Sequence, residues 1–258
     1  MLLATHPGLA LVTLSLIALI IGSFLNVVIY RLPLMYNDAL SAKPFNLAWP
    51  ASMCPQCQTP LRIRDNIPLL SFFWLKGRSA CCQQPISWRY PLIEALSLVF
   101  TLILLFHFGW QIKLAVALLL TYSLLALSAI DINEQILPDC ITLPLLWLGL
   151  AVNSFEVFTP AQDAIWGAIL GFTFLFVIDR LYYLVRKHPG LGGGDCKLLA
   201  ALGAFFGVEA LLPIILVASM LGLCVALIGM ALGKIKYNIP LAFGPFLALA
   251  GWGYLFFI

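Results

Sequence analysis

Residues 9–30 read LALVTLSLIALIIGSFLNVVIY, a long apolar run without a charged side chain. A helix of about 20 apolar residues is long enough to cross the hydrocarbon core of a bilayer. We therefore expect this segment to be a membrane-spanning helix. The residues before it supply neither a basic region nor a small-residue cleavage site, so we expect it to be retained rather than removed as a signal peptide.

The rest of the chain has the same character. Of its 258 residues, 62% are hydrophobic and only 10% are charged, whereas a soluble domain carries about 25% charged residues. This composition excludes an ordinary soluble enzyme and predicts a protein whose main partner is the lipid bilayer. The net charge of +3 is modest, and we expect no nucleic-acid partner.

Seven further apolar stretches are long enough, or nearly long enough, to span a membrane. They are residues 91–109, 113–130, 141–158, 164–185, 197–208, 211–232 and 240–257. The sequence therefore predicts an all-α polytopic fold of about eight transmembrane helices, with seven as the alternative count. The stretch 197–208 is short and is either a half-helix or a tilted helix that continues further. We expect no internal repeat.

The apolar pattern divides the chain into three parts. Residues 1–30 form the first transmembrane helix, residues 31–90 a small cysteine-containing loop domain, and residues 91–258 a transmembrane domain. The loop domain holds seven of the fourteen Lys and Arg residues.

The remaining basic connections lie on the same side of the membrane as this loop when eight segments are counted. By the positive-inside rule that side is cytoplasmic, and both termini are then outside. These connections contain Arg186, Lys187, Lys234 and Lys236.

Two aspartates occupy matching places in this topology. Asp131 ends the third apolar stretch, in IDINEQILPD, and Asp195 precedes the sixth, in GLGGGD. Both are expected at the cytoplasmic ends of their helices. A carboxylate at membrane depth is costly and by default functional. Two neighbouring carboxyls share a proton, so that one acts as a base toward water and the other as an acid. The sequence therefore predicts a catalytic pair for aspartic proteolysis.

The glycines before Asp195 support this interpretation. Gly192, Gly193 and Gly194 give a backbone without side chains, which a peptide substrate can approach closely. We expect these residues to contact the substrate.

Simpler structural roles compete for the acidic residues. Asp195 also fits the N-cap of a helix that begins at Lys197, and Asp139 fits the N-cap of the next apolar stretch. Glu94 opens the second stretch, either as a cap or as an acid that faces a cavity.

Four of the seven cysteines lie in the loop domain, as CPQC at 54–57 and the pair Cys81 and Cys82. A CxxC motif with a second cysteine pair about 25 residues later suggests zinc. Adjacent cysteines seldom both bind one tetrahedral ion, and the position three before Cys82 is Ser79. Free thiols, or three cysteines with an outside ligand, are the alternatives.

Taken together, these motifs resemble those of the type IV prepilin peptidases, the leader peptidases and N-methyltransferases of pilus and type II secretion systems. The likeness runs from about residue 20 to about residue 250. It is carried by CPQC (54–57), DNIPLLSF (65–72), RYPLIE (89–94), IDINEQILPD (130–139), TLPLLWLGL (142–150) and GGGDCKLLAALGAFFG (192–207). The GxGD element also resembles that of presenilin-like intramembrane aspartyl proteases.

The resemblance implies that Asp131 and Asp195 are catalytic. It implies cleavage of basic leader peptides from prepilins or pseudopilins, after a glycine, at the cytoplasmic face of the bacterial inner membrane. It also implies methylation of the new N-terminus by S-adenosylmethionine, with residues 31–90 associated with this activity. The family pattern aligns with Cys54, Cys57 and Cys82 but expects a cysteine at Ser79, while Cys81 is displaced.

Two other classes of protein remain open from the sequence. Paired carboxylates and a glycine-broken helix also occur in ion- or proton-coupled transporters. A membrane scaffold whose loop binds metal is the third possibility. Neither accounts for both the aspartates and the cysteine loop.

Overall fold

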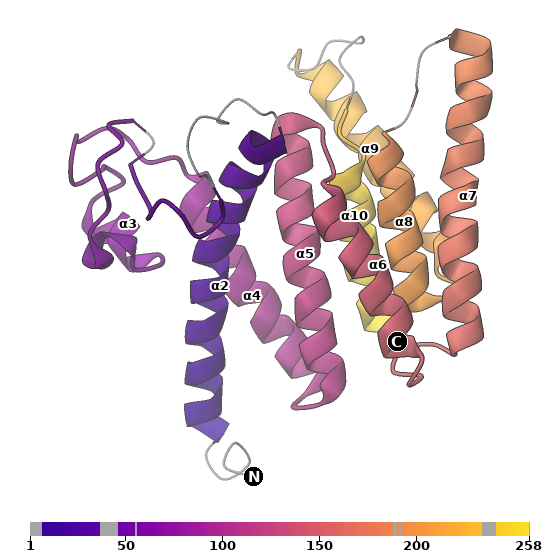
Figure 1. The fold of residues 1–258 in the computed structure, drawn as a ribbon, viewed down its shortest axis with the longest axis horizontal. Helices are drawn as coiled ribbons and strands as arrows, with labels where there is room; N and C mark the ends of the chain where they lie inside the picture. The colour runs from indigo at the N-terminus through magenta and orange to yellow at the C-terminus, as the bar shows by residue number, and fades with distance from the viewer. Residues whose placement is uncertain are drawn as a thin grey trace. The chain divides into compact units, whose positions relative to one another are not determined.

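The structure is a computed structural model that describes residues 7–36, 46–54, 56–187, 190, 192–233 and 241–257 (Figure 1). These residues form helices and connecting loops, and no β-strand occurs among them. Extended pairing within the described ranges consists of two isolated bridges, Met53 with Pro60 and Arg78 with Pro85. The predicted all-α fold is therefore confirmed.

The chain divides into two compact units, residues 1–114 and 115–258. The sequence predicts a different division, into residues 1–30, 31–90 and 91–258, which follows the expected membrane boundaries. That division stays a prediction. The helices of the first unit are α2 (Pro7–Tyr36), η1 (Ile63–Asn66), α3 (Leu70–Trp74) and α4 (Arg89–Phe108).

In the first unit α2 packs against α4 through a glycine. A Cβ built on Gly22 would lie 2.9 Å from the Cα of Glu94, so the two backbones approach closely only because Gly22 has no side chain. Glu94 is buried and accepts the backbone N–H of Leu69 at 2.8 Å. It lies beyond the first turn of α4, which begins at Arg89. The interpretation of Glu94 as a cap is therefore wrong, because its carboxylate binds the loop domain.

Arg31 also connects α2 to the loop domain. Its guanidinium is buried and donates to the carbonyl oxygens of Asn46 at 2.9 Å and Pro50 at 2.7 Å. Together, Arg31 and Glu94 fix parts of the polar segment to the helix pair by hydrogen bonds to its backbone.

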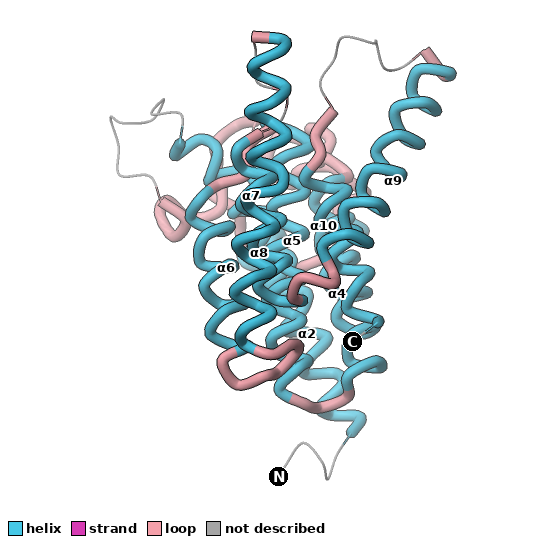
Figure 2. Tube along the Cα trace, turned by 90° about the vertical axis from the view of Figure 1, so that its right-hand side faces the viewer, coloured by secondary structure: helices cyan, strands magenta, loops and turns pink. Residues whose placement is uncertain are grey.

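The second unit is a helix bundle with a short helix at its centre (Figures 1 and 2). Its elements are α5 (Ile112–Glu134, which begins in the first unit), α6 (Asp139–Asn153), α7 (Ala161–Arg186), α8 (Gly193–Phe206), α9 (Leu211–Ala231), α10 (Gly244–Tyr254) and η2 (Leu255–Phe257). α8 packs against α6, α7 and α10. Every residue of α8 from Leu198 to Phe206 is buried, so this helix forms the core of the unit.

Backbone contact and a buried amide hold α8 in place. On α7 Gly167 meets Gly203 of α8 so closely that a Cβ on either would overlap the other's carbonyl. At the end of α8, Asn153 Nδ2 donates to the carbonyl oxygens of Ala204 and Phe205, both at 2.8 Å. These carbonyls belong to the last turn of α8, where the helix itself provides no backbone N–H donor for them.

All eight predicted apolar segments contain a helix, but their lengths differ. Among the described residues, five helices are long and apolar enough to cross a membrane: α2, α4, α5, α7 and α9. α6, α8 and α10 have only 15, 14 and 11 residues. At 1.5 Å per residue these are shorter than the roughly 30 Å of the hydrocarbon core. The prediction of a short helix near 197–208 is confirmed, while α6 and α10 are shorter than predicted.

Candidate active site and cysteine cluster

Asp131 and Asp195 lie at the same end of the second unit. Asp131 is in the last turn of α5, and Asp195 is in the first turn of α8. The end of α7 and the start of α6 also lie at this end, whereas the α6–α7 and α8–α9 connections lie at the other (Figures 1 and 2). Both side chains are buried, with 5% and 7% exposure. The expected placement at matching helix ends is therefore observed.

The two carboxylates interact electrostatically, and one side chain packs between the starts of α8 and α10. Leu137, in the α5–α6 connection, would contact a Cβ on Gly194 at 2.6 Å and a Cβ on Gly244 at 3.2 Å. The structure thus brings the starts of α8 and α10 together around the end of α5.

Asp131 is held by a residue that the sequence analysis missed. The backbone N–H of Gly244 donates to Asp131 Oδ2 at 3.0 Å. Gly244 is the first residue of α10, where backbone N–H groups have no helical acceptor and favour a negative charge. The available signal was Gly244-Pro245 inside an apolar stretch, because proline marks the start of a helix.

Asp195 lies inside its helix rather than at the cap. α8 begins at Gly193 and its N-cap is Gly192, so the N-cap interpretation of Asp195 is wrong. Its Oδ1 is buried and has no hydrogen-bond partner among the described residues. Buried carboxylate oxygens are normally hydrogen-bonded. This oxygen is therefore suited to receive a proton or to bind a water or a substrate group.

The three glycines before Asp195 have different surroundings. A Cβ on Gly192 would lie 3.4 Å from Asp195 Oδ2, and one on Gly194 would overlap Leu137. A Cβ on Gly193 would have no neighbour within 4 Å. Gly194 thus has a packing role, while Gly193 borders space that no described residue fills.

Asp139 connects α6 to α8. It is the first residue of α6, whose N-cap is Pro138, so the N-cap prediction for Asp139 is wrong. Its carboxylate instead forms an ion pair with Lys197 Nζ at 2.6 Å. Because Lys197 follows Asp195 by two residues, this pair helps to fix the first turn of α8.

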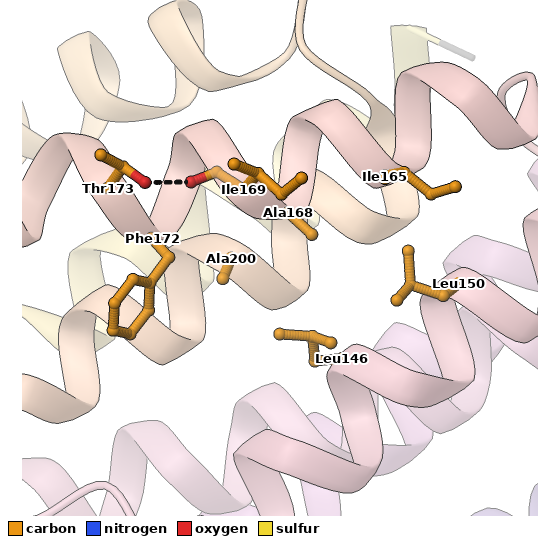
Figure 3. Close-up of a pocket in the computed structure, with 8 residues that line it drawn as sticks. All are labelled: Leu146, Leu150, Ile165, Ala168, Ile169, Phe172, Thr173 and Ala200. Carbon is orange, nitrogen blue, oxygen red and sulfur yellow. Dashed lines mark hydrogen bonds between the residues drawn. The ribbon is translucent and has the colours of Figure 1, made fainter.

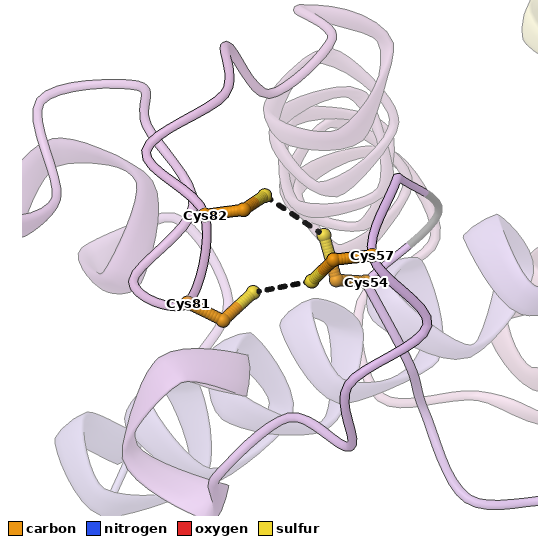
Figure 4. A group of neighbouring side chains, drawn as sticks. All are labelled: Cys54, Cys57, Cys81 and Cys82. Atoms are coloured by element: carbon orange, nitrogen blue, oxygen red, sulfur yellow. Dashed lines mark hydrogen bonds between the residues drawn. The ribbon is translucent and has the colours of Figure 1, made fainter.

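The four loop cysteines form one cluster in the first unit (Figure 4). Their Sγ atoms all lie within 4.8 Å of one another. Cys54 Sγ is 3.7 Å from Cys82 Sγ, and Cys57 Sγ is 3.1 Å from Cys81 Sγ. A zinc–sulfur bond of 2.3 Å implies about 3.8 Å between tetrahedral thiolates. The donor set therefore fits zinc, and the adjacent cysteines both belong to it.

The surroundings of Cys54 favour its thiolate. Burial raises the pKa of this thiol, but hydrogen bonds from the Ser79 side chain and from the backbone of Cys57 and Gln56 outweigh burial and lower the pKa to about 6. The thiolate is the form of cysteine that binds metal.

An apolar cavity of about 390 Å³ lies between α6, α7 and α8 (Figure 3). Thr173 supplies the only hydroxyl in its lining, and this hydroxyl donates to the Ile169 carbonyl at 2.7 Å. The lining contains no titratable side chain, so this cavity is not a site for acid–base chemistry.

Two family models match the chain, one within each unit. Residues 16–108 match the model of the bacterial peptidase A24 N-terminal domain, and residues 118–227 match that of the type IV leader peptidase family. A protein of Dickeya chrysanthemi is 47% identical over 96% of this chain and 92% of its own length. The chain belongs to the type IV leader peptidase family. The second match includes both aspartates, and the first includes all four clustered cysteines.

Other relatives agree with this assignment. Proteins of Stutzerimonas stutzeri and Neisseria gonorrhoeae are 43% and 41% identical, over 97% and 92% of this chain and 91% and 87% of their own lengths. All three relatives are named prepilin leader peptidase/N-methyltransferase. No solved structure matches the chain. These names give no support to the transporter interpretation.

Proposed function

We propose that this family member is a membrane aspartic endopeptidase with Asp131 and Asp195 as its catalytic pair. It removes basic leader peptides from prepilins or pseudopilins and methylates the new N-terminal amine. The observation that carries this proposal is the placement of two buried carboxylates at the same end of the second unit, on helices that are far apart in the sequence. One is held by a backbone N–H, and the other has a buried oxygen without a hydrogen-bond partner in the described part of the chain.

In this mechanism the two carboxyls share one proton. The ionised carboxyl takes a proton from water, whose oxygen adds to the scissile carbonyl carbon, while the protonated carboxyl gives its proton to the carbonyl oxygen. The C–N bond then breaks and the leaving amine takes up a proton. The Gly244 N–H fixes the orientation of Asp131, and the open space beside Gly193 admits an extended substrate backbone.

The charge pattern supports a site at the cytoplasmic face of the inner membrane. Arg186, in the last turn of α7, and the adjacent Lys187 lie at the same end of the second unit as the aspartates. By the positive-inside rule this end faces the cytoplasm, where the basic leader of a membrane-inserted prepilin lies. Exposed Glu134 is placed to attract that leader. The predicted basic residues Lys234 and Lys236 lie outside the described residues.

Methylation requires a donor, and the family function implies S-adenosylmethionine. The amine nitrogen takes the methyl group from the donor's sulfonium, which leaves as the thioether, and the amine releases a proton. We propose that Cys54, Cys57, Cys81 and Cys82 hold a zinc ion in the loop domain. When bound, the ion supplies a structural crosslink to a segment too small to form a large core.

The test is cleavage of a prepilin in detergent by the purified chain and by Asp131→Asn and Asp195→Asn. Both substitutions are expected to abolish hydrolysis. Asp163→Asn is the matched control, because Asp163 is an exposed aspartate in the first turn of α7, at the opposite end of the unit. Mass spectrometry of the product N-terminus reports cleavage and methylation together. Hydrolysis that survives either substitution would exclude the proposed pair.

A further inference from the structure

The cysteine cluster is built from two turns with the same backbone structure. In the first cysteine turn (residues 53–60), Cys54 N–H donates to Thr59 O and Gln58 N–H donates to Cys54 O, both at 2.9 Å. In the second cysteine turn (residues 78–85), Ser79 N–H donates to Gln84 O at 2.8 Å and Gln83 N–H donates to Ser79 O at 2.9 Å.

Other backbone features repeat with the same spacing. Each turn is closed by an isolated antiparallel bridge between its ends, Met53 with Pro60 and Arg78 with Pro85. Each contains a glutamine in the left-handed region, with φ of 57° at Gln58 and 59° at Gln83. The expectation of no internal repeat is therefore wrong, because one short turn occurs twice. The repeat is short in the sequence, where CQTP (57–60) and CQQP (82–85) agree at three of four positions.

The repeat defines which positions are equivalent. With an offset of 25 residues, Cys57 corresponds to Cys82, and Cys54 corresponds to Ser79. The second turn thus has a hydroxyl where the first has a thiol. Its extra thiol, Cys81, corresponds to Gln56 of the first turn.

The side chains around position 79 show which group takes the place of the missing thiol. Ser79 is buried, and its Oγ lies 3.5 Å from Cys54 Sγ and 2.9 Å from Cys81 Sγ. Cys81 Sγ lies within 4.8 Å of the other three sulfurs. The hydroxyl is therefore at the edge of the cluster, and a thiol from two residues later completes it.

We propose that Cys81 is the fourth zinc ligand in place of position 79, and that the Ser79 hydroxyl donates a hydrogen bond to the bound thiolates. This inference rests on the proposed zinc site and adds the role of position 79 beside its ligands. Four thiolates around Zn²⁺ leave a net negative charge, which a hydroxyl donor stabilises. Position 79 thus supplies no metal ligand, and its serine hydroxyl donates a hydrogen bond to the ligands instead.

The test measures metal binding by the full chain in detergent, with zinc content by mass spectrometry and cobalt(II) as a spectroscopic probe. The thiolate-to-cobalt absorption scales with the number of bound thiolates. Cys81→Ala is expected to reduce that number from four to three. Its zinc affinity is expected to fall by more than the about 10- to 100-fold that loss of an outer-shell partner costs.

Ser79→Ala separates the two roles. It is expected to keep four thiolates while zinc affinity falls by about 10- to 100-fold, as for an outer-shell hydrogen bond. The double variant Ser79→Cys with Cys81→Ala is expected to restore four thiolates, because position 79 is equivalent to Cys54. Cys224→Ala, an exposed cysteine of α9, is the control and is expected to bind metal as the unmodified chain does.

Three results would overturn the inference. They are an unchanged cobalt spectrum in Cys81→Ala, a lost ligand in Ser79→Ala, and a double variant that binds no better than Cys81→Ala alone. An unmodified chain that binds neither zinc nor cobalt, or that contains a Cys57–Cys81 disulfide, would remove the zinc site itself. Peptide cleavage by the aspartate pair is measured separately and does not depend on these outcomes.

Discussion

Replacement of Gly244 by alanine tests how the aspartate pair is positioned. The new Cβ would lie 2.6 Å from Asp131 Oδ2 and 3.2 Å from both methyl carbons of Leu137. The first distance is shorter than any relaxed contact, so the carboxylate has to rotate and its 3.0 Å hydrogen bond is lost or bent. We therefore expect Gly244→Ala to fold but to cleave slowly.

The size of the effect follows from that hydrogen bond. A hydrogen bond to a charged group contributes about 1.5–3 kcal/mol, and each 1.36 kcal/mol changes a rate tenfold. The rate of prepilin cleavage should therefore fall about 10- to 100-fold. The measurement is single-turnover cleavage in detergent, with the midpoint of thermal unfolding as a check on folding.

The same helix offers a matched control. Gly253 is also in α10, and a Cβ there would have no neighbour within 4 Å. Gly253→Ala should therefore cleave at the unmodified rate. A Gly244→Ala enzyme that cleaves within about twofold of that rate would refute the role of this amide, because a bent or lost bond of this class costs more.

Three further predictions concern the surroundings of the site. Asn153→Leu should lower the stability of the chain by at least about 2 kcal/mol, because two buried carbonyls lose their donor and each unsatisfied group costs about 1–3 kcal/mol. Unfolding in detergent measures this, and an unchanged midpoint would contradict it. Lys197→Met removes an ion pair whose partners are both partly exposed, so stability should change by less than about 1 kcal/mol. Cleavage should slow, because the pair helps to fix the first turn of α8, which carries Asp195. A loss of stability with unchanged cleavage would show that the pair does not position Asp195. Gly193→Ala should leave stability unchanged, whereas Gly194→Ala should lower it through overlap with Leu137; equal unfolding midpoints for these two variants would contradict the packing role of Gly194.

The main features of the fold follow from sequence because apolar run length is a direct physical requirement of the bilayer. All eight predicted segments contain a helix for this reason. Helix ends were less predictable. α8 begins at Gly193 rather than Lys197, because glycine is tolerated in a first turn when a neighbour such as Leu137 needs the space. Helix propensities describe single residues, so they do not predict a tertiary contact such as this one.

The candidate site was only partly accessible from sequence. Asp131 and Asp195 stand out because charges are rare in apolar chains. Gly244 does not, since it contributes a backbone N–H, which every residue except proline carries. Likewise, Cys54 and Ser79 differ in residue type, and it is the matching backbone hydrogen bonds that show their positions to be equivalent.

The contact between Gly167 and Gly203 has a consequence for motion. No side chains lie between these two backbones that could exchange rotamers, so we expect α7 and α8 to move as one rigid body, with Asp195 carried along. Admission of a substrate would then require displacement of α5 or the start of α10 away from this fixed pair. A crosslink between α7 and α8 should therefore leave turnover intact, whereas one that fixes α10 to α8 should trap the enzyme in a single state.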